Sequence, residues 1–175
     1  MTTQNKESTL ELIHKAIKEH QDQPHGNSRP VFYGELELDD VDFVSLPQEH
    51  MFPYLNAALD NCVNELELKN TGGKWLEVRP KDSRQLFTDF LTCSYLLEYA
   101  SMLEHRAAHF IDYILEVFNP VRFFTNIGHG NSMSPSPVLN LTISHKAYKE
   151  LGYMEFTFAI ITKNKIGVFC SFGKD

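Results

Sequence analysis

The chain has 175 residues, of which 42% are hydrophobic and 22% charged, and this composition is typical of one globular domain with a full core. Its formal net charge is −7 and it contains only 16 Lys and Arg residues, which argues against a surface that binds nucleic acid or an anionic membrane. We therefore expect a single domain over residues 1–175, with a flexible start at residues 1–7.

The start of the chain and the cysteines bear on location. The first residues lack the continuous apolar run of a secretory signal peptide, and nowhere do about 18 apolar residues follow one another, as a membrane-spanning helix requires. The cysteines Cys62, Cys93 and Cys170 are far apart and follow no metal-ligand or disulfide spacing. Free cysteines in apolar patterns behave as small buried hydrophobes in a reducing compartment, so we expect a cytoplasmic protein.

The first predicted elements are a helix and a strand. Apolar residues recur at helical spacing from Ser8 onward, and Ser8 with Glu11 has the form of a capping box. This helix must end before Pro24, where a cluster of Pro, Gly, Asn and Ser begins. The β-prone sequence VFYGELEL then predicts a strand near residues 31–38.

A second helix is predicted from about Pro47 to Leu68, because apolar residues again fall on one side of a helical pattern. Pro53 should confine its regular part to the later turns, since proline cannot donate the helical hydrogen bond. The sequence NTGG at residues 70–73 should end this helix, and KWLEV at residues 74–78 predicts a short strand.

The longest periodic segment covers residues 83–118. Its apolar residues advance in steps of three and four along one stripe, which predicts one long central helix, or two helices with a break, ending at Pro120. We expect the core to include Leu103, Ala107, Phe110, Ile114 and Phe158.

The hydrophobic period changes to two after residue 120, and this change predicts four strands that close the chain. TKNKIG, between the last two, is typical of a hairpin turn in which Asn164 can take the left-handed conformation. The expected fold is α+β: a mainly antiparallel C-terminal sheet packs one face against the long central helix and leaves the other face to water, and helices precede it in the N-terminal part.

The central helix carries a possible metal site, which we call the histidine ridge: His105, His109, Asp112 and Glu116. The helical advance places these side chains in one line, and two histidines four residues apart with a carboxylate one turn on suit a divalent transition metal. The ridge lies opposite the apolar stripe, however, on the face expected to meet water. We therefore favour a solvated helix face over a metal site.

Two further segments are candidates for binding. The loop NIGHGNSMSPSP at residues 126–137 carries His129, Asn131 and Ser132 beside glycines that would let a ligand approach the backbone, although a plain connection between strands is the favoured interpretation. Cations between Lys74 and Arg84 surround Trp75, the only tryptophan, and could hold an anion, but solvated surface charges are again favoured.

Taken together, the sequence favours a binding protein. It has thirteen Phe and seven Tyr residues, which suit cores and interfaces, and it lacks the GxSxG, GxGxxG and P-loop motifs of common enzymes. We expect a small acidic protein without a cofactor that acts by binding another protein, as an adaptor, inhibitor or immunity-type factor, and its charge favours a basic partner. The alternative is a metal-dependent hydrolase or other metalloenzyme that uses the histidine ridge.

Overall fold

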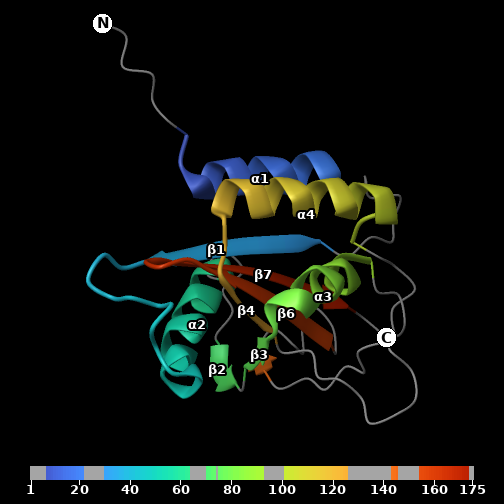
Figure 1. The fold of residues 1–175 in the computed structure, drawn as a ribbon. Coiled ribbons are helices and arrows are strands. Elements are labelled where there is room, and N and C mark those ends of the chain that lie inside the picture. The colour runs from blue at the N-terminus through green and yellow to red at the C-terminus, as the bar shows by residue number, and fades with distance from the viewer. Residues whose placement is uncertain are drawn as a thin grey trace, which may run out of the picture.

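A computed structural model describes residues 7–21, 30–63, 70–73, 75–92, 101–125, 143–145 and 154–173, so most of the expected flexible start lies outside the described residues. Helices and strands alternate irregularly along the chain, and Figure 1 shows their arrangement. The helices are α1 (Thr9–His20), α2 (Gln48–Val63), α3 (Pro80–Thr92) and α4 (Glu104–Phe118). The strands are β1 (Val31–Glu37), β2 (Asn70–Gly73), β3 (Leu76–Val78), β4 (Arg122–Thr125), β5 (Ile143–His145), β6 (Met154–Ile161) and β7 (Lys165–Gly173).

Five strands form one antiparallel sheet in the order β1-β7-β6-β4-β3. The hairpin of β6 and β7 lies at its centre, where Phe158 pairs with Phe169, and β1 pairs with the other side of β7. β2 and β5 form a separate two-stranded antiparallel sheet. The expectation of an α+β fold with a mainly antiparallel sheet is therefore confirmed, although the sheet also contains β1 and β3 from the first half of the chain.

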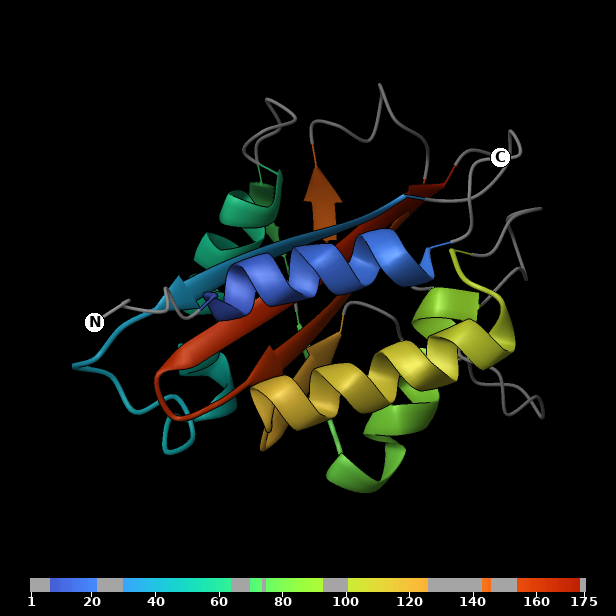
Figure 2. The same ribbon diagram turned by 90° about the horizontal axis from the view of Figure 1, so that it is seen from above.

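Helices cover both faces of the five-stranded sheet. In Figure 1, α1 and α4 lie on one side of the sheet and α2 lies on the other, and Figure 2 shows α1 running along β1 with α4 beside it. Neighbouring residues of each central strand therefore point into different cores. One, the three-helix core, is formed by α1, α3, α4 and one sheet face and includes Phe87, Phe110, Phe158, Ile160 and Phe169. The other, the α2 core, is formed by α2 and the opposite face and includes Leu55, Leu59, Trp75, Ala159 and Val168.

This second cover corrects the expectation that one sheet face is open to water. Every residue from Thr157 to Ile161 is buried, and so is every residue from Ile166 to Ser171. A strand buried on both faces is apolar nearly throughout, as in FAII and IGVFC. The expectation of one open face counted only every second large residue in these runs and overlooked that the residues between them are apolar too.

The long central segment is two helices, which was the second of the two forms expected. α3 ends at Thr92, and the backbone N–H groups of Ser101 and Met102 both donate to the Leu91 carbonyl, at 2.9 and 3.0 Å. α4 then begins after Leu103, whose side chain is 52% exposed, so the expected burial of Leu103 is wrong. Periodicity alone cannot separate one helix from two that bury the same stripe.

Of the predictions made from short sequence motifs, one is confirmed and two are wrong. The capping box at the start of α1 is present, because Ser8 Oγ accepts from the Glu11 N–H and the Glu11 carboxylate accepts from the Ser8 N–H. α2 runs through the exposed Pro53, contrary to expectation, since a proline this close to a helix start removes few helical hydrogen bonds. Among the described non-glycine residues only Asn119, the C-cap of α4, has a positive φ (49°), so Asn164 does not adopt the expected left-handed conformation.

The described helices contain no segment with the length and apolar character needed to cross a bilayer.

Candidate functional site

β1 forms one edge of the five-stranded sheet, and among the described residues no strand pairs with its outer side. The direction of its backbone groups follows from their partners. The Val31 N–H bonds to the side chain of Gln21, the C-cap of α1, and the carbonyls of Tyr33 and Glu35 bond to side chains from α1 and α2. The odd-numbered residues therefore face outward. Because the N–H and C=O of one residue in an antiparallel strand point to the same side, the N–H groups of Tyr33 and Glu35 also face the open edge.

Side chains from α1 and α2 occupy part of this edge. His14 Nε2 donates to the Tyr33 carbonyl at 3.0 Å, and Asn61 Nδ2 donates to the Glu35 carbonyl at 2.7 Å. The Val31 N–H donates to Gln21 Oε1 at 3.4 Å. For the outward N–H groups of Tyr33 and Glu35, the described part of the chain supplies no acceptor. Within the described residues, the edge therefore keeps two N–H groups without an acceptor, next to carbonyls that helix side chains already bind.

A groove of about 650 Å³ follows this edge, with α1 as one wall and α2 as the other. We call it the edge groove. Its lining combines apolar, polar and charged residues: Leu10, His14, Ile17 and Lys18 from α1, the C-cap Gln21, residues 31–35 of β1, and Asn61 and Cys62 from α2. A second hollow in the described residues, between α1 and α4, is smaller, at about 150 Å³. The edge groove is thus large enough for several side chains of a bound segment.

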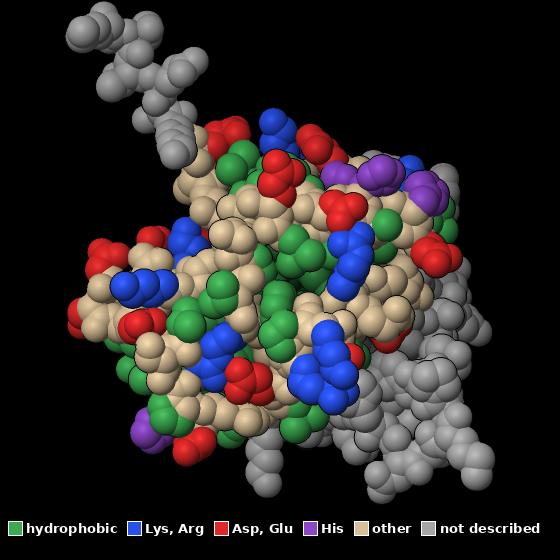
Figure 3. Space-filling view, viewed as in Figure 1, with side chains coloured by type: hydrophobic (Ala, Val, Ile, Leu, Met, Phe, Trp, Pro, Cys, Tyr) green, Lys and Arg blue, Asp and Glu red, His purple; other side chains and the backbone are tan. Residues whose placement is uncertain are grey.

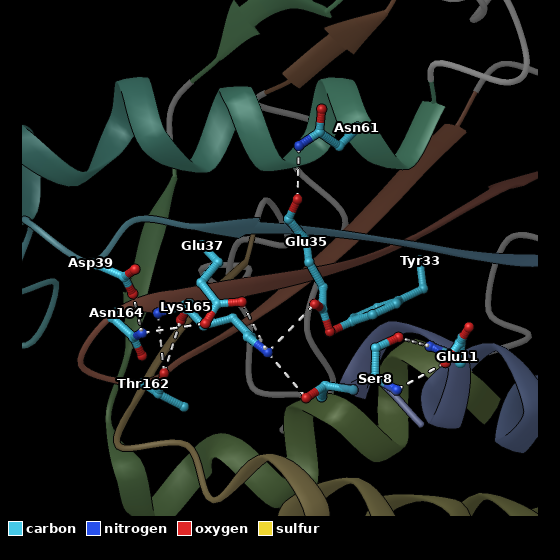
Figure 4. A network of polar contacts seen from close by, with 11 residues as sticks. Ser8, Glu11, Tyr33, Glu35, Glu37, Asp39, Asn61, Thr162, Asn164 and Lys165 are labelled. Carbon is cyan, nitrogen blue, oxygen red and sulfur yellow. Dashed lines mark hydrogen bonds and ion pairs between the residues drawn. The ribbon is translucent and has the colours of Figure 1, made fainter. Parts of the chain in front are cut away.

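A polar network beside the groove joins β1, β7 and the start of α1 (Figure 4). The Tyr33 hydroxyl donates to the Glu35 carboxylate at 2.8 Å, and Lys165 Nζ lies 3.7 Å from the same carboxylate. Lys165 also donates to Thr9 Oγ1 at 3.0 Å, which ties the start of α1 to the sheet. Burial raises the pKa of the Tyr33 phenol well above its ordinary value of 10.0, and the nearby Glu35 carboxylate raises it further, so Tyr33 stays neutral and acts as a donor.

Two cysteines, one of which lines the groove, lie in contact, although their spacing in the sequence gave no sign of it. Cys62 Sγ on α2 lies 2.9 Å from Cys170 Sγ on β7, and both cysteines are buried and unbridged. Their contact depends on the close approach of α2 to β1, where Gly34 leaves room for the backbone of Cys62. The predicted burial of these two residues is confirmed.

The histidine ridge lies on α4, away from the edge groove, and His105, His109, Asp112 and Glu116 are all exposed. Asp112 accepts a hydrogen bond from Arg84 of α3 at 2.6 Å, and this bond lowers the pKa of the Asp112 carboxyl below its ordinary value. In the described parts of the chain no three His, Cys, Asp or Glu side chains are placed to hold a metal ion. A divalent metal at this ridge, and equally the expected lack of a cofactor, stay predictions.

The two other candidate sites are the loop at residues 126–137 and the cations around Trp75. His129, Asn131 and Ser132 lie outside the described residues. Trp75 is buried, with Nε1 donating to Asn56 at 3.0 Å, so it is not available to a surface anion site, and Arg84 is paired with Asp112. Figure 3 shows acidic and basic side chains interspersed on one face, with histidines gathered over the ends of the helices at its upper side.

The edge groove could not be predicted from the sequence, because it forms only when β1 pairs with β7, a strand far from it along the chain. One local signal was available: Glu35 and Glu37 in a short strand are typical of a sheet edge, where charges discourage unwanted pairing. The fold and the groove define a three-layer α+β protein with a partly open edge strand. Comparison of the chain with models of protein families, with curated proteins and with solved structures gave no match.

Proposed function

We propose that this protein acts by binding another protein, as an adaptor, inhibitor or immunity-type factor, and that the partner places an extended segment along β1 in the edge groove. The observation that carries the proposal is the pair of outward N–H groups of Tyr33 and Glu35 beside a groove of about 650 Å³. An added strand would accept from both groups, and its alternate side chains would enter the groove on either side.

Charge at the groove favours a segment that carries a carboxylate. Lys18 lines the α1 wall and has no ion-pair partner among the described residues. The Glu35 carboxylate is already engaged by Tyr33 and Lys165. The net charge of −7 still favours a partner with a positive potential overall, since long-range steering depends on the whole surface.

Selection of displayed peptides tests this proposal directly. Short random linear peptides on phage would be panned against the immobilised full chain, and the dissociation constant of each enriched peptide measured by calorimetry. We expect enriched peptides to carry an acidic residue among alternating apolar residues. Bound peptide should slow hydrogen exchange at the amides of Tyr33 and Glu35, because these donors become paired.

A matched pair of variants separates the groove from general surface effects. Leu10 lines the groove and is 37% exposed, whereas Leu103, the N-cap of α4, is 52% exposed and lies outside the groove. Leu10→Asp should weaken peptide binding by about tenfold or more, and Leu103→Asp should leave it unchanged. Peptides insensitive to Leu10→Asp would contradict the proposal. So would a dimer of the chain that protects the same two amides without peptide, because the edge would then serve a second copy.

The alternative function, a metal-dependent enzyme, predicts a different result from the same preparation. Elemental analysis of the purified protein would then find a stoichiometric transition metal, and the double variant His105→Gln/His109→Gln would lose it. A solvated ridge predicts no stoichiometric metal and a change in unfolding free energy of at most about 0.5 kcal/mol in that variant.

A further inference from the structure

The contact between Cys62 and Cys170 joins two elements that are far apart in sequence. Cys62 lies near the end of α2 and Cys170 lies in β7, and their Sγ atoms are 2.9 Å apart. A disulfide has an S–S length of about 2.05 Å, so bond formation needs a movement of less than roughly 1 Å between the sulfurs. Both residues are in the thiol form here.

The two thiols differ in access to reagents. Cys62 is 6% exposed and lines the edge groove, so it is the member of the pair that borders the groove. Cys170 is 0% exposed and lies within the α2 core. This arrangement has the two parts of a thiol pair that oxidises in sequence: an outer thiol that meets the oxidant and an inner thiol that resolves the adduct.

We propose that Cys62 and Cys170 are a thiol oxidation site that closes to an intramolecular disulfide when the protein meets a low-molecular-weight disulfide. The Cys62 thiolate attacks one sulfur of the reagent, forms a mixed disulfide and releases one thiolate. The Cys170 thiolate then attacks the Cys62 sulfur and releases the second. The protein loses two electrons and two protons, the reagent is reduced to two thiols, and the reverse reaction with excess thiol reopens the bond.

Closure fastens the last turn of α2 to β7, the strand that pairs with β1. Asn61 on that turn donates to the Glu35 carbonyl, and Gly34 sits against the backbone of Cys62, so this turn is also a wall of the edge groove. The oxidised form should therefore show slower hydrogen exchange in the last turn of α2 than the reduced form. The oxidation site goes beyond the proposed function and does not depend on it.

The test uses the full chain with oxidised glutathione as the probe. After incubation, the intact mass is recorded first, and the free thiols are then alkylated and the protein digested for peptide mass spectrometry. We expect the intact mass to fall by two hydrogen atoms, a cross-linked peptide pair containing Cys62 and Cys170, and an alkylated Cys93. Excess dithiothreitol should restore three alkylatable cysteines.

Variants supply the controls. Cys93→Ser should form the same cross-link as the wild type, whereas Cys170→Ser should accumulate glutathione on Cys62 because nothing resolves the adduct. The proposal is overturned if the wild type keeps a persistent glutathione adduct on Cys62, if the cross-link includes Cys93, or if both paired thiols are still alkylated in full after oxidation. The wild type and Cys93→Ser decide the question even if Cys170→Ser does not fold.

Discussion

At position 34 the space between β1 and α2 admits only a hydrogen atom. A Cβ atom there would lie 2.3 Å from the Cys62 nitrogen and 2.6 Å from its Cα. Both are backbone atoms in a helix, so they cannot turn away as a side chain can. This single residue therefore sets how closely the α2 wall of the edge groove approaches its strand, and it brings Cys62 within reach of Cys170.

We predict that Gly34→Ala lowers the free energy of unfolding by about 2–3 kcal/mol, because the added methyl group must push α2 away from the sheet. Gly167→Ala is the matched control. Its Cβ would meet the Tyr33 side chain, with the hydroxyl oxygen at 2.4 Å, and we expect a smaller loss there because no backbone atom has to move. Urea unfolding measures both variants, and an equal or smaller loss in Gly34→Ala would show that α2 yields easily.

Some residue roles were readable from sequence because their cause is local. The capping box of Ser8 and Glu11 depends only on spacing, and it is present. The predicted burial of Leu103 is wrong because a place in the helical stripe does not show whether the helix has already begun. Leu103 is the exposed N-cap of α4. The groove residue His14 belongs to a helix that was predicted, but its bond to Tyr33 depends on tertiary placement.

At the scale of elements, α3 and α4 are joined across their exposed sides by Arg84 and Asp112. The hydrogen bond from Arg84 is the main cause of the lowered pKa of the Asp112 carboxyl, and His109 lowers it to a smaller extent. A lowered pKa in the folded state means that the interaction stabilises the fold fully above the ordinary value of 3.8, and that this contribution is lost as pH falls through the lowered pKa.

We predict that Arg84→Gln moves the pKa of Asp112 up toward its ordinary value, since the charged donor is removed. Titration of the side-chain carboxyl carbon by NMR measures the shift. His109→Gln is the comparison, and its upward shift should be smaller because the histidine acts only through its charge. Equal shifts in the two variants, or no shift in Arg84→Gln, would contradict this account of the α3–α4 contact.

Most elements follow from hydrophobic period, and their assembly does not. Helical spacing located α1 and α4, and the period of two located β6 and β7. The same patterns could not show that the central segment breaks after Thr92, because both helices bury one stripe. Nor could they assign β1 to the sheet edge, since strand order is a property of long-range pairing.

At the scale of the whole molecule, the two cores share every central strand. Phe158 and Phe169 point into the three-helix core, while their neighbours Ala159 and Val168 point into the α2 core. A change in one core can therefore reach the other through the backbone of β6 and β7. Domains larger than about 150 residues often unfold in more than one step. Whether the two cores unfold together can therefore be measured.

Trp75 makes that measurement direct, because it is the only tryptophan and lies in the α2 core. Phe110 lies in the three-helix core, where its ring packs edge-on against Phe169 with centroids 5.9 Å apart. We predict that Phe110→Ala destabilises the protein by about 3–5 kcal/mol through the cavity it leaves. The unfolding transition seen by Trp75 fluorescence should shift as far as the one seen by far-UV circular dichroism.

Two outcomes distinguish a shared sheet from two separable layers. If the layers unfold separately, Phe110→Ala shifts the circular dichroism transition and leaves the Trp75 transition in place. Leu59→Ala, in the α2 core, should shift both signals in a cooperative molecule. Leu103→Ala, at an exposed position, should shift neither by more than about 0.5 kcal/mol. We expect the fluorescence and circular dichroism transitions to shift together, because β6 and β7 each contribute side chains to both cores.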